Sequence, residues 1–211
     1  MDELAKWDNV VKFHGHSCMG LAMGFRVSLA ALKKLGGSRD TDEELVAIVE
    51  NDSCAVDAIQ YVTGCTMGKG NLFFRDYGKP VYTFCQRKDG KAIRLVVKGL
   101  DENKYPELSA LREKVSSGEA AEEEKQKYDQ KAQEALQAFL NDPLESIMDI
   151  EEVEIDLPEK ARIFKSINCA LCGEKVMEPR ARVKDNQAVC IPCADLYERH
   201  DSEITGKFAN N

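Results

Sequence analysis

The stretch Phe13-His14-Gly15-His16-Ser17-Cys18-Met19-Gly20 places two of the chain's three histidines and one of its eight cysteines close together. Imidazole nitrogen and thiolate sulfur are ligands that suit zinc, nickel or iron. An apolar pattern with helical spacing follows, and its members are Leu21, Phe25, Leu29 and Leu32. The pattern predicts a helix that begins near Cys18 and ends at Leu35 before Gly36-Gly37. Its N-terminus would favour the thiolate of Cys18.

A second cysteine occupies the same kind of position further along the chain. Leu45–Val49 reads as a strand, the polar residues 51–53 follow it, and a helix is expected to open at Cys54. Val10–Phe13 reads as a short strand before the first loop. If the two strands are parallel neighbours, both loops lie at the carboxyl edge of one sheet. The residues expected to converge there are His14, His16, Cys18, Asp52 and Cys54.

The role of Cys65 and of the loop after it stays open. A helix from Cys54 to Val62 rises about 13 Å, which argues against a metal shared by Cys54 and Cys65, so Cys65 is only a reserve ligand. The loop 65–71 contains two glycines and Lys69, which could cradle an anion. An ordinary tight loop explains the same residues.

The rest of the first 160 residues predicts antiparallel strands followed by helices. The expected elements are strands at 71–75, 81–87 and 92–98, helices at 107–115 and 119–140, and a strand at 153–157. The apolar stripe of the longer helix is expected to pack on the sheet, and a homodimer contact is the alternative.

Two cysteine pairs near the C-terminus form the most specific motif of the chain. Cys169-Ala170-Leu171-Cys172 and Cys190-Ile191-Pro192-Cys193 stand 17 residues apart, a spacing typical of a structural four-cysteine zinc site. A hairpin between the pairs and a helix after Cys190 would resemble a treble-clef zinc finger. His200 reads as a surface histidine.

Charge and composition narrow the classes of function. A net charge of −8 and a pI near 5.1 argue against nucleic acid as a bulk electrostatic partner. No apolar run approaches the length of a membrane span, and residues 1–6 lack the pattern of a signal peptide. Eight cysteines without an export signal are typical of metal ligands and reduced thiols. We therefore expect a cytoplasmic protein.

Three motifs in order resemble the FmdE family of formylmethanofuran dehydrogenase proteins. They are the stretch 13–20, Asn51-Asp52-Ser53-Cys54-Ala55-Val56-Asp57-Ala58-Ile59-Gln60, and residues 63–72, and the match continues through 76–79. The resemblance implies an α+β core with a thioredoxin-like arrangement, in which helices flank a mixed sheet. It implies a core domain at 1–160, a treble-clef zinc finger at 161–211, and a metal-capable site in the core.

The resemblance favours an accessory protein that binds metal and serves a molybdenum or tungsten formylmethanofuran dehydrogenase or a related redox enzyme. The other chains of that enzyme would be its partners. A free-standing metalloenzyme is the alternative, with Asp52 or Asp57 as general base and Lys69 as the site for an anionic substrate. A regulator that binds DNA through the finger is a third hypothesis, and the negative net charge of the chain argues against it. The sequence leaves open whether the chain is an enzyme.

Overall fold

The computed structural model describes residues 6–100 and 104–194. The chain divides into two compact units, Met1–Ala161 and Arg162–Asn211, which are described separately. No helix of the described residues is long and apolar enough to cross a membrane.

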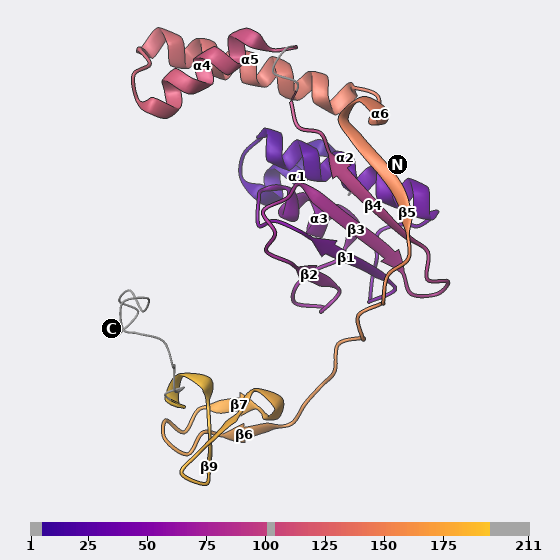
Figure 1. The fold of residues 1–211 in the computed structure, drawn as a ribbon, viewed down its shortest axis with the longest axis vertical. Helices are drawn as coiled ribbons and strands as arrows, with labels where there is room; N and C mark the ends of the chain where they lie inside the picture. The colour runs from indigo at the N-terminus through magenta and orange to yellow at the C-terminus, as the bar shows by residue number, and fades with distance from the viewer. Residues whose placement is uncertain (1–5, 101–103, 195–211) are drawn as a thin grey trace. The chain divides into compact units, whose positions relative to one another are not determined.

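Unit 1 is built on a five-stranded sheet in the order β2-β1-β3-β4-β5 (Figure 1). Its strands are β1 (Leu45–Val49), β2 (Leu72–Phe74), β3 (Val81–Gln86), β4 (Ala92–Val97) and β5 (Met148–Val153). β1 pairs with β2 in parallel, whereas the pairs β1–β3, β3–β4 and β4–β5 are antiparallel. The predicted α+β class with a mixed sheet is therefore confirmed.

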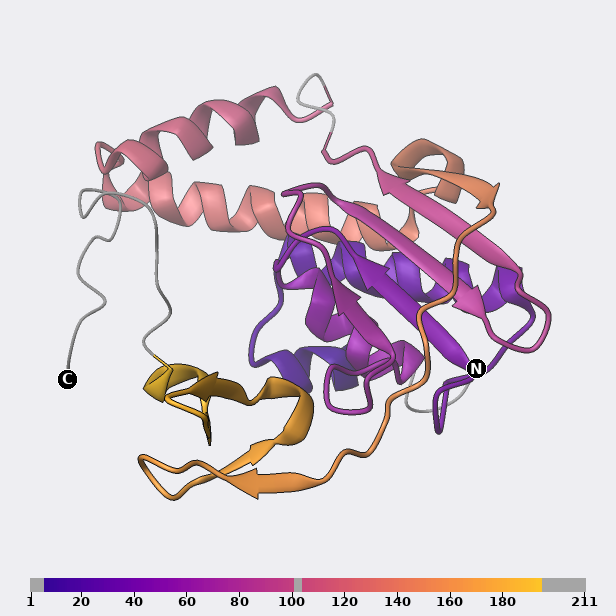
Figure 2. The ribbon, with the colours of Figure 1, turned by 60° about the horizontal axis from the view of Figure 1, so that its bottom comes forward.

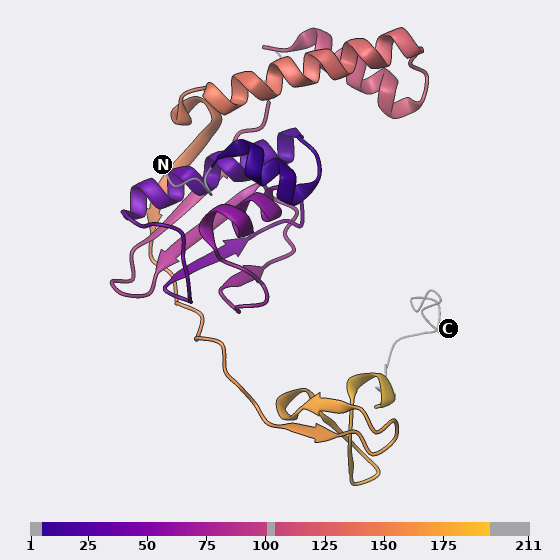
Figure 3. The same ribbon diagram turned by 180° about the vertical axis from the view of Figure 1, so that it is seen from behind.

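The described residues of unit 1 form six helices beside this sheet. They are α1 (Trp7–His14), α2 (Met19–Leu35), α3 (Ala55–Thr63), α4 (Pro106–Ser117), α5 (Glu122–Asn141) and α6 (Leu144–Ile147). α2 lies against β3 and β4 and packs along α3, while α1 contacts both of these helices (Figures 2 and 3). α4 and α5 form a hairpin, and α5 also packs on α2. The main core lies between the sheet and these helices.

The contact between α2 and α3 depends on a residue without a side chain. A Cβ atom built on Gly24 would lie 2.1 Å from the carbonyl oxygen of Ala55, far inside van der Waals contact. The backbones of the two helices therefore touch at this point. Ser28, one turn further along α2, is fully buried and donates its hydroxyl to the carbonyl of Gly24 at 2.7 Å.

The strand predicted at Val10–Phe13 is wrong, because these residues belong to α1. Trp7 and Val10 lie three residues apart and face the core, where Val10 is fully buried and the Trp7 ring lies 5.5 Å from that of Phe25. A four-residue apolar run is compatible with either structure, and the tryptophan before it extends the helical spacing. The predicted pair of parallel strands at the first two loops is consequently absent.

Two further strand predictions need correction. The strand near 71–75 exists as β2, but it is parallel to β1, because α3 carries the chain across between them. The strand expected at 153–157 lies earlier, at Met148–Val153, where it pairs with the whole length of β4. Residues 154–161 have no regular structure.

Unit 2 consists of short elements around the two cysteine pairs. They are β6 (Ser166–Asn168), β7 (Lys175–Met177), η2 (Glu178–Arg180), β8 (Arg182–Lys184), β9 (Gln187–Val189) and η3 (Ile191–Cys193). Asp185 and Asn186, with φ of 49° and 59°, make the tight turn between β8 and β9. This is the hairpin that the sequence predicts. The helix expected after Cys190 begins as η3, and its later residues and His200 lie outside the described residues.

The close approach of α2 and α3 makes a prediction for Gly24→Ala. The added methyl group would meet backbone atoms, which cannot turn aside as a side chain can, so we expect unit 1 to lose about 2 kcal/mol or more. Thermal unfolding should show a midpoint about 4–8 °C lower. Gly68→Ala is the control, because a Cβ there meets nothing within 4 Å. Equal midpoints for both variants would contradict the direct contact of the two helices.

Candidate metal centre

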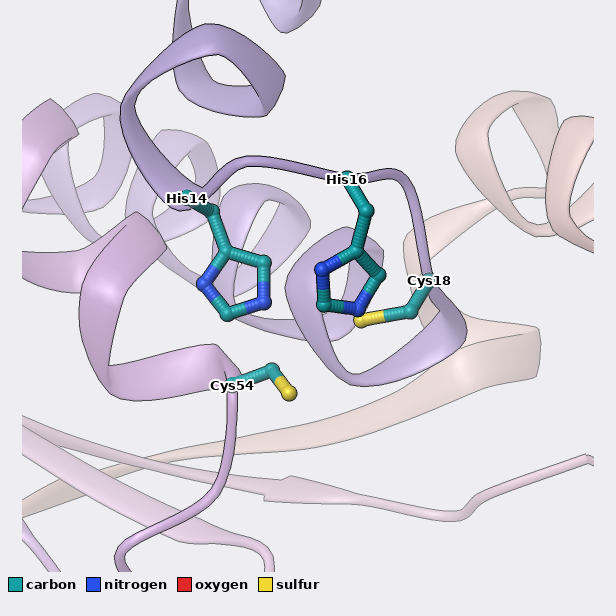
Figure 4. Close-up of side chains that lie close together, drawn as sticks. All are labelled: His14, His16, Cys18 and Cys54. Carbon is teal, nitrogen blue, oxygen red and sulfur yellow. The ribbon is translucent and has the colours of Figure 1, made fainter.

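Four side chains converge where α1, α2 and α3 meet. One nitrogen each of His14 and His16 and the sulfurs of Cys18 and Cys54 all lie within 4.8 Å of one another. Figure 4 shows the two rings and the two thiols around a common point. His14 is the last residue of α1, while Cys18 and Cys54 are the N-caps of α2 and α3. His16 lies in the connecting loop and is exposed.

The loop between α1 and α2 turns on Gly15. Its φ of 101° is the left-handed conformation that glycine adopts without strain, and its N–H donates to the carbonyl of Val11. The helix therefore ends directly after His14, and the chain reverses so that His16 faces His14. The ring centroids of the two histidines lie 4.5 Å apart.

His14 is oriented by a carboxylate on the neighbouring helix. Its Nδ1 lies 2.7 Å from Oδ2 of Asp57, in the first turn of α3. Its Nε2 is buried and has no hydrogen-bond partner among the described residues. Ligating histidines in metalloproteins typically give their second nitrogen to a carboxylate, which fixes the ring for the metal. The polar atom left without a partner is the one aimed at the two sulfurs, so the site fits a metal ion.

The two thiols complete the donor set. The Cys18 sulfur accepts the N–H of Leu21 at 3.4 Å, whereas Cys54 makes no capping hydrogen bond. Burial raises the pKa of the Cys54 thiol, and the neighbouring Cys18 side chain raises this pKa further. Two imidazoles and two thiols at this spacing match the tetrahedral Cys₂His₂ set that binds Zn²⁺. As the sequence predicts, Cys18 stands at the start of a helix.

Asp52 and Asp57 lie beside this group rather than in it. Both line a cavity of about 330 Å³ that His14 and Cys54 also line. Asp52 is exposed, and only Asp57 bonds to a histidine of the group. The sequence offered Asp57 as a general base, but not as the partner of His14. The sequence did contain one indication of this role, because Asp57 lies only three residues after Cys54, at the start of the same predicted helix.

Cys65 lies apart from the four converging side chains, beyond the opposite end of α3. It is fully buried, and its thiol donates to the carbonyl of Leu45 at 3.4 Å. Burial raises the pKa of the Cys65 thiol to about 12. The thiol therefore stays protonated and serves the packing of unit 1.

Lys69 is already paired within the protein. Its ammonium group lies 2.9 Å from Oδ2 of Asp40 and donates to the carbonyl of Asp42. Asn71 is fully buried and donates to the same carboxylate oxygen. This cluster fixes the loop 65–71 against the segment before β1. The positive charge of Lys69, which an anionic substrate would need, is already paired with Asp40.

The second group of possible ligands lies in unit 2. The sulfurs of Cys169, Cys172, Cys190 and Cys193 lie within 4.8 Å of one another. The N–H of Cys190 donates to the Cys169 sulfur at 3.3 Å. Donation from the backbone of Cys172 and then of Cys190 lowers the pKa of the Cys169 thiol to about 6. Thiolates are the form that binds zinc.

Comparisons with known proteins cover both units. Residues 13–149 match the family model described as FmdE, molybdenum formylmethanofuran dehydrogenase operon. Residues 162–199 match the model of the prokaryotic dksA/traR C4-type zinc finger. The cysteine cluster of unit 2 is thus that of a zinc-finger domain.

The individual proteins that are similar to the chain include these two. One is a "probable S-adenosyl-L-methionine-binding protein" of Archaeoglobus fulgidus, 36% identical over 193 residues, which are 88% of this chain and 51% of the relative. The chain therefore spans about half the length of that protein. The other is the crystal structure of a tungsten formylmethanofuran dehydrogenase FmdE-like protein from Syntrophus aciditrophicus. It has a TM-score of 0.61 and 21% identity over 88% of each chain, so the two share a fold.

The buried state of Cys65 makes a prediction about its reactivity. Because its pKa is raised from the ordinary 9.0 to about 12, native protein treated with iodoacetamide at about pH 8 should leave Cys65 unlabelled. The protonated thiol stabilises the fold fully below pH 9.0, and this contribution is lost as the pH rises toward about 12. Peptide mass spectrometry measures the labelling. Rapid labelling of Cys65 in folded protein would contradict the assignment.

Proposed function

The chain belongs to the FmdE family, and on that premise we propose that it is an accessory protein of a molybdenum or tungsten formylmethanofuran dehydrogenase or a related redox enzyme. In this role unit 1 holds a metal ion through His14, His16, Cys18 and Cys54. The zinc finger of unit 2 is the module that contacts the partner enzyme. Metal binding itself agrees with the family and with both groups of ligand residues.

One observation carries the proposal for unit 1. The buried Nε2 of His14 lacks a hydrogen bond among the described residues, and its position is fixed by the bond from Nδ1 to Asp57. A buried polar atom without a partner is costly, and a metal ion shared with the other three ligands would remove that cost. The packing of α2 against α3 supplies both sulfurs at the same place.

The ligand types favour zinc. Two thiolates and two imidazoles form a tetrahedral set that suits Zn²⁺, while nickel and iron accept the same atoms with other preferred geometries. When bound, such an ion supplies positive charge that holds both thiols in the thiolate form. The chain's own contribution is to orient His14 through Asp57 and to keep the two sulfurs together.

The number of ligands favours an accessory role over catalysis. A four-ligand zinc site is closed, whereas catalytic zinc sites keep one position open for water or substrate. The free-standing metalloenzyme remains the second candidate because His16 is exposed on its loop. If His16 left the metal, three ligands would remain, with Asp52 at the edge of the neighbouring cavity.

The metal content of purified protein tests the centre in unit 1. We expect about two metal ions per chain in the wild type and about one in Cys18→Ala, since the finger would keep its own ion. Cys65→Ala is the matched control, because this buried thiol lies outside the group and should leave the count unchanged. A count of one in the wild type, with no gain on adding zinc, would refute the centre.

Asp57 provides a finer comparison in the same experiment. Asp57→Asn should weaken metal affinity in unit 1 by about 10- to 100-fold, as loss of the carboxylate behind a ligating histidine usually does. Asp52→Asn is the control, because Asp52 lies in the same cavity without bonding to His14. Competition with a chromogenic chelator measures both affinities.

The accessory role is tested by isolating the tagged chain from its native source. We expect the chains of a molybdenum or tungsten oxidoreductase to co-purify, and Cys169→Ser to abolish this by unfolding the finger. Cys18→Ala reports whether the metal of unit 1 is also needed. Recovery of the tagged chain without any oxidoreductase chain would count against the role, and turnover of a substrate by the isolated protein would favour the second candidate.

A further inference from the structure

A larger cavity, of about 760 Å³, lies on another side of the metal ligands. Its walls are the first turns of α2, residues 99–100, and the hairpin of α4 and α5. Its lining includes Cys18, Tyr105, Leu108, Arg112, Tyr128 and Asp129. A volume of this size is typical of sites for small organic molecules.

The hairpin contributes one face of each helix to this cavity. Leu108 and Arg112 lie one turn apart on α4, as Tyr128 and Ala132 do on α5. Leu108 and Leu136 are only 7% and 2% exposed. These apolar side chains are therefore recessed at the bottom of the cavity, whereas a helix face that docks a protein partner exposes its apolar side chains.

Two opposite charges, both on exposed side chains, line the cavity and have no partner among the described residues. The guanidinium of Arg112 and the carboxylate of Asp129 form no hydrogen bond or ion pair with any described residue. Other charges of the same hairpin are paired, as Lys114 is with Glu124 and Lys127 with Glu107. Both charged side chains that line the cavity are therefore available to a ligand.

We propose that this cavity binds a zwitterionic small molecule of the amino-acid class that carries a flat ring. Its carboxylate lies at Arg112, where a guanidinium offers paired donors, and its ammonium group lies at Asp129. The ring lies among the apolar residues and the tyrosines, since aromatic faces favour stacking. Cys18 belongs both to the cavity and to the metal ligands, so the ligand lies beside the metal centre.

Binding of such a molecule goes beyond the proposed accessory role and does not depend on it. Arg112 and Asp129 are not among the four converging ligands, so the charge preference of the cavity can be measured whether or not unit 1 holds a metal.

Four indole compounds separate the contributions of charge. L-tryptophan carries both charges, indole-3-propionate only the carboxylate, tryptamine only the ammonium group, and 3-methylindole neither. Saturation-transfer NMR titrations on the full-length, zinc-loaded protein give the dissociation constants. We expect L-tryptophan to bind tightest, with a loss of about three- to fivefold for each missing charge, as expected for exposed ion pairs.

Two charge-removing variants assign each contribution. Arg112→Gln should weaken L-tryptophan and indole-3-propionate while leaving tryptamine unchanged, and Asp129→Asn should weaken L-tryptophan and tryptamine alone. Lys88→Gln is the control, because Lys88 is an exposed cation that does not line the cavity. Circular dichroism confirms that each variant is folded.

The outcomes decide between the alternatives. Equal affinity for all four compounds would overturn the zwitterion and leave a purely apolar pocket, and no binding below about 10 mM would overturn the site. A charge pattern that persists after zinc is removed supports the cavity even where the metal centre fails. Loss of metal in Cys18→Ala with no charge pattern in the wild type would support the centre and refute this inference.

Discussion

The direct contact of α2 with α3 is the constraint on which unit 1 depends. The backbones of the two helices touch at Gly24, near the start of α2, and at Ala55, the first residue of α3. The residues that directly precede the two helices, Cys18 and Cys54, therefore also lie close together. A Cβ on Gly20 would lie 3.3 Å from the Cβ of Cys54, so this closeness extends to the first turn. Helix packing thus brings together two cysteines that are 36 positions apart in the sequence, before any ion is considered.

The sequence predicted this convergence correctly in outcome and wrongly in cause. Cys18 and Cys54 do begin helices, as the caps and the apolar spacing indicated, but the expected sheet edge is not what joins them. Val10–Phe13 is helical, so the first histidine comes from the end of a helix. A short apolar run indicates that a segment is buried, but it is too short to show whether its apolar residues repeat with the period of a helix or of a strand. The sequence also could not predict the contact at Gly24. A glycine within a helix indicates a close approach of backbones only when the neighbouring helix is known.

Features set by local chemistry were easier to predict than features set by tertiary pairing. Local sequence predicted the grouping of the four C-terminal cysteines, the glycine that ends α2 and the hairpin of the finger, and all three are found in the structure. The parallel pairing of β2 with β1 and the position of β5 depend on which strand is available as a neighbour. The hydrogen bond between Asp57 and His14 and the placement of Arg112 and Asp129 at the large cavity also depend on tertiary structure.

The two units differ in what a metal ion does for their folding. Unit 1 buries an extensive apolar core, which includes Leu21, Ile59 and Phe84, and this core can hold the fold by itself. Among the described residues of unit 2, the buried apolar side chains are those of Cys169 and Val189. So small a module depends on its metal for stability. Unit 1 therefore has a source of stability other than an ion. The ligand residues that it brings together, two half-buried thiols and a buried histidine nitrogen without a hydrogen-bond partner among the described residues, carry a cost to stability that this core offsets.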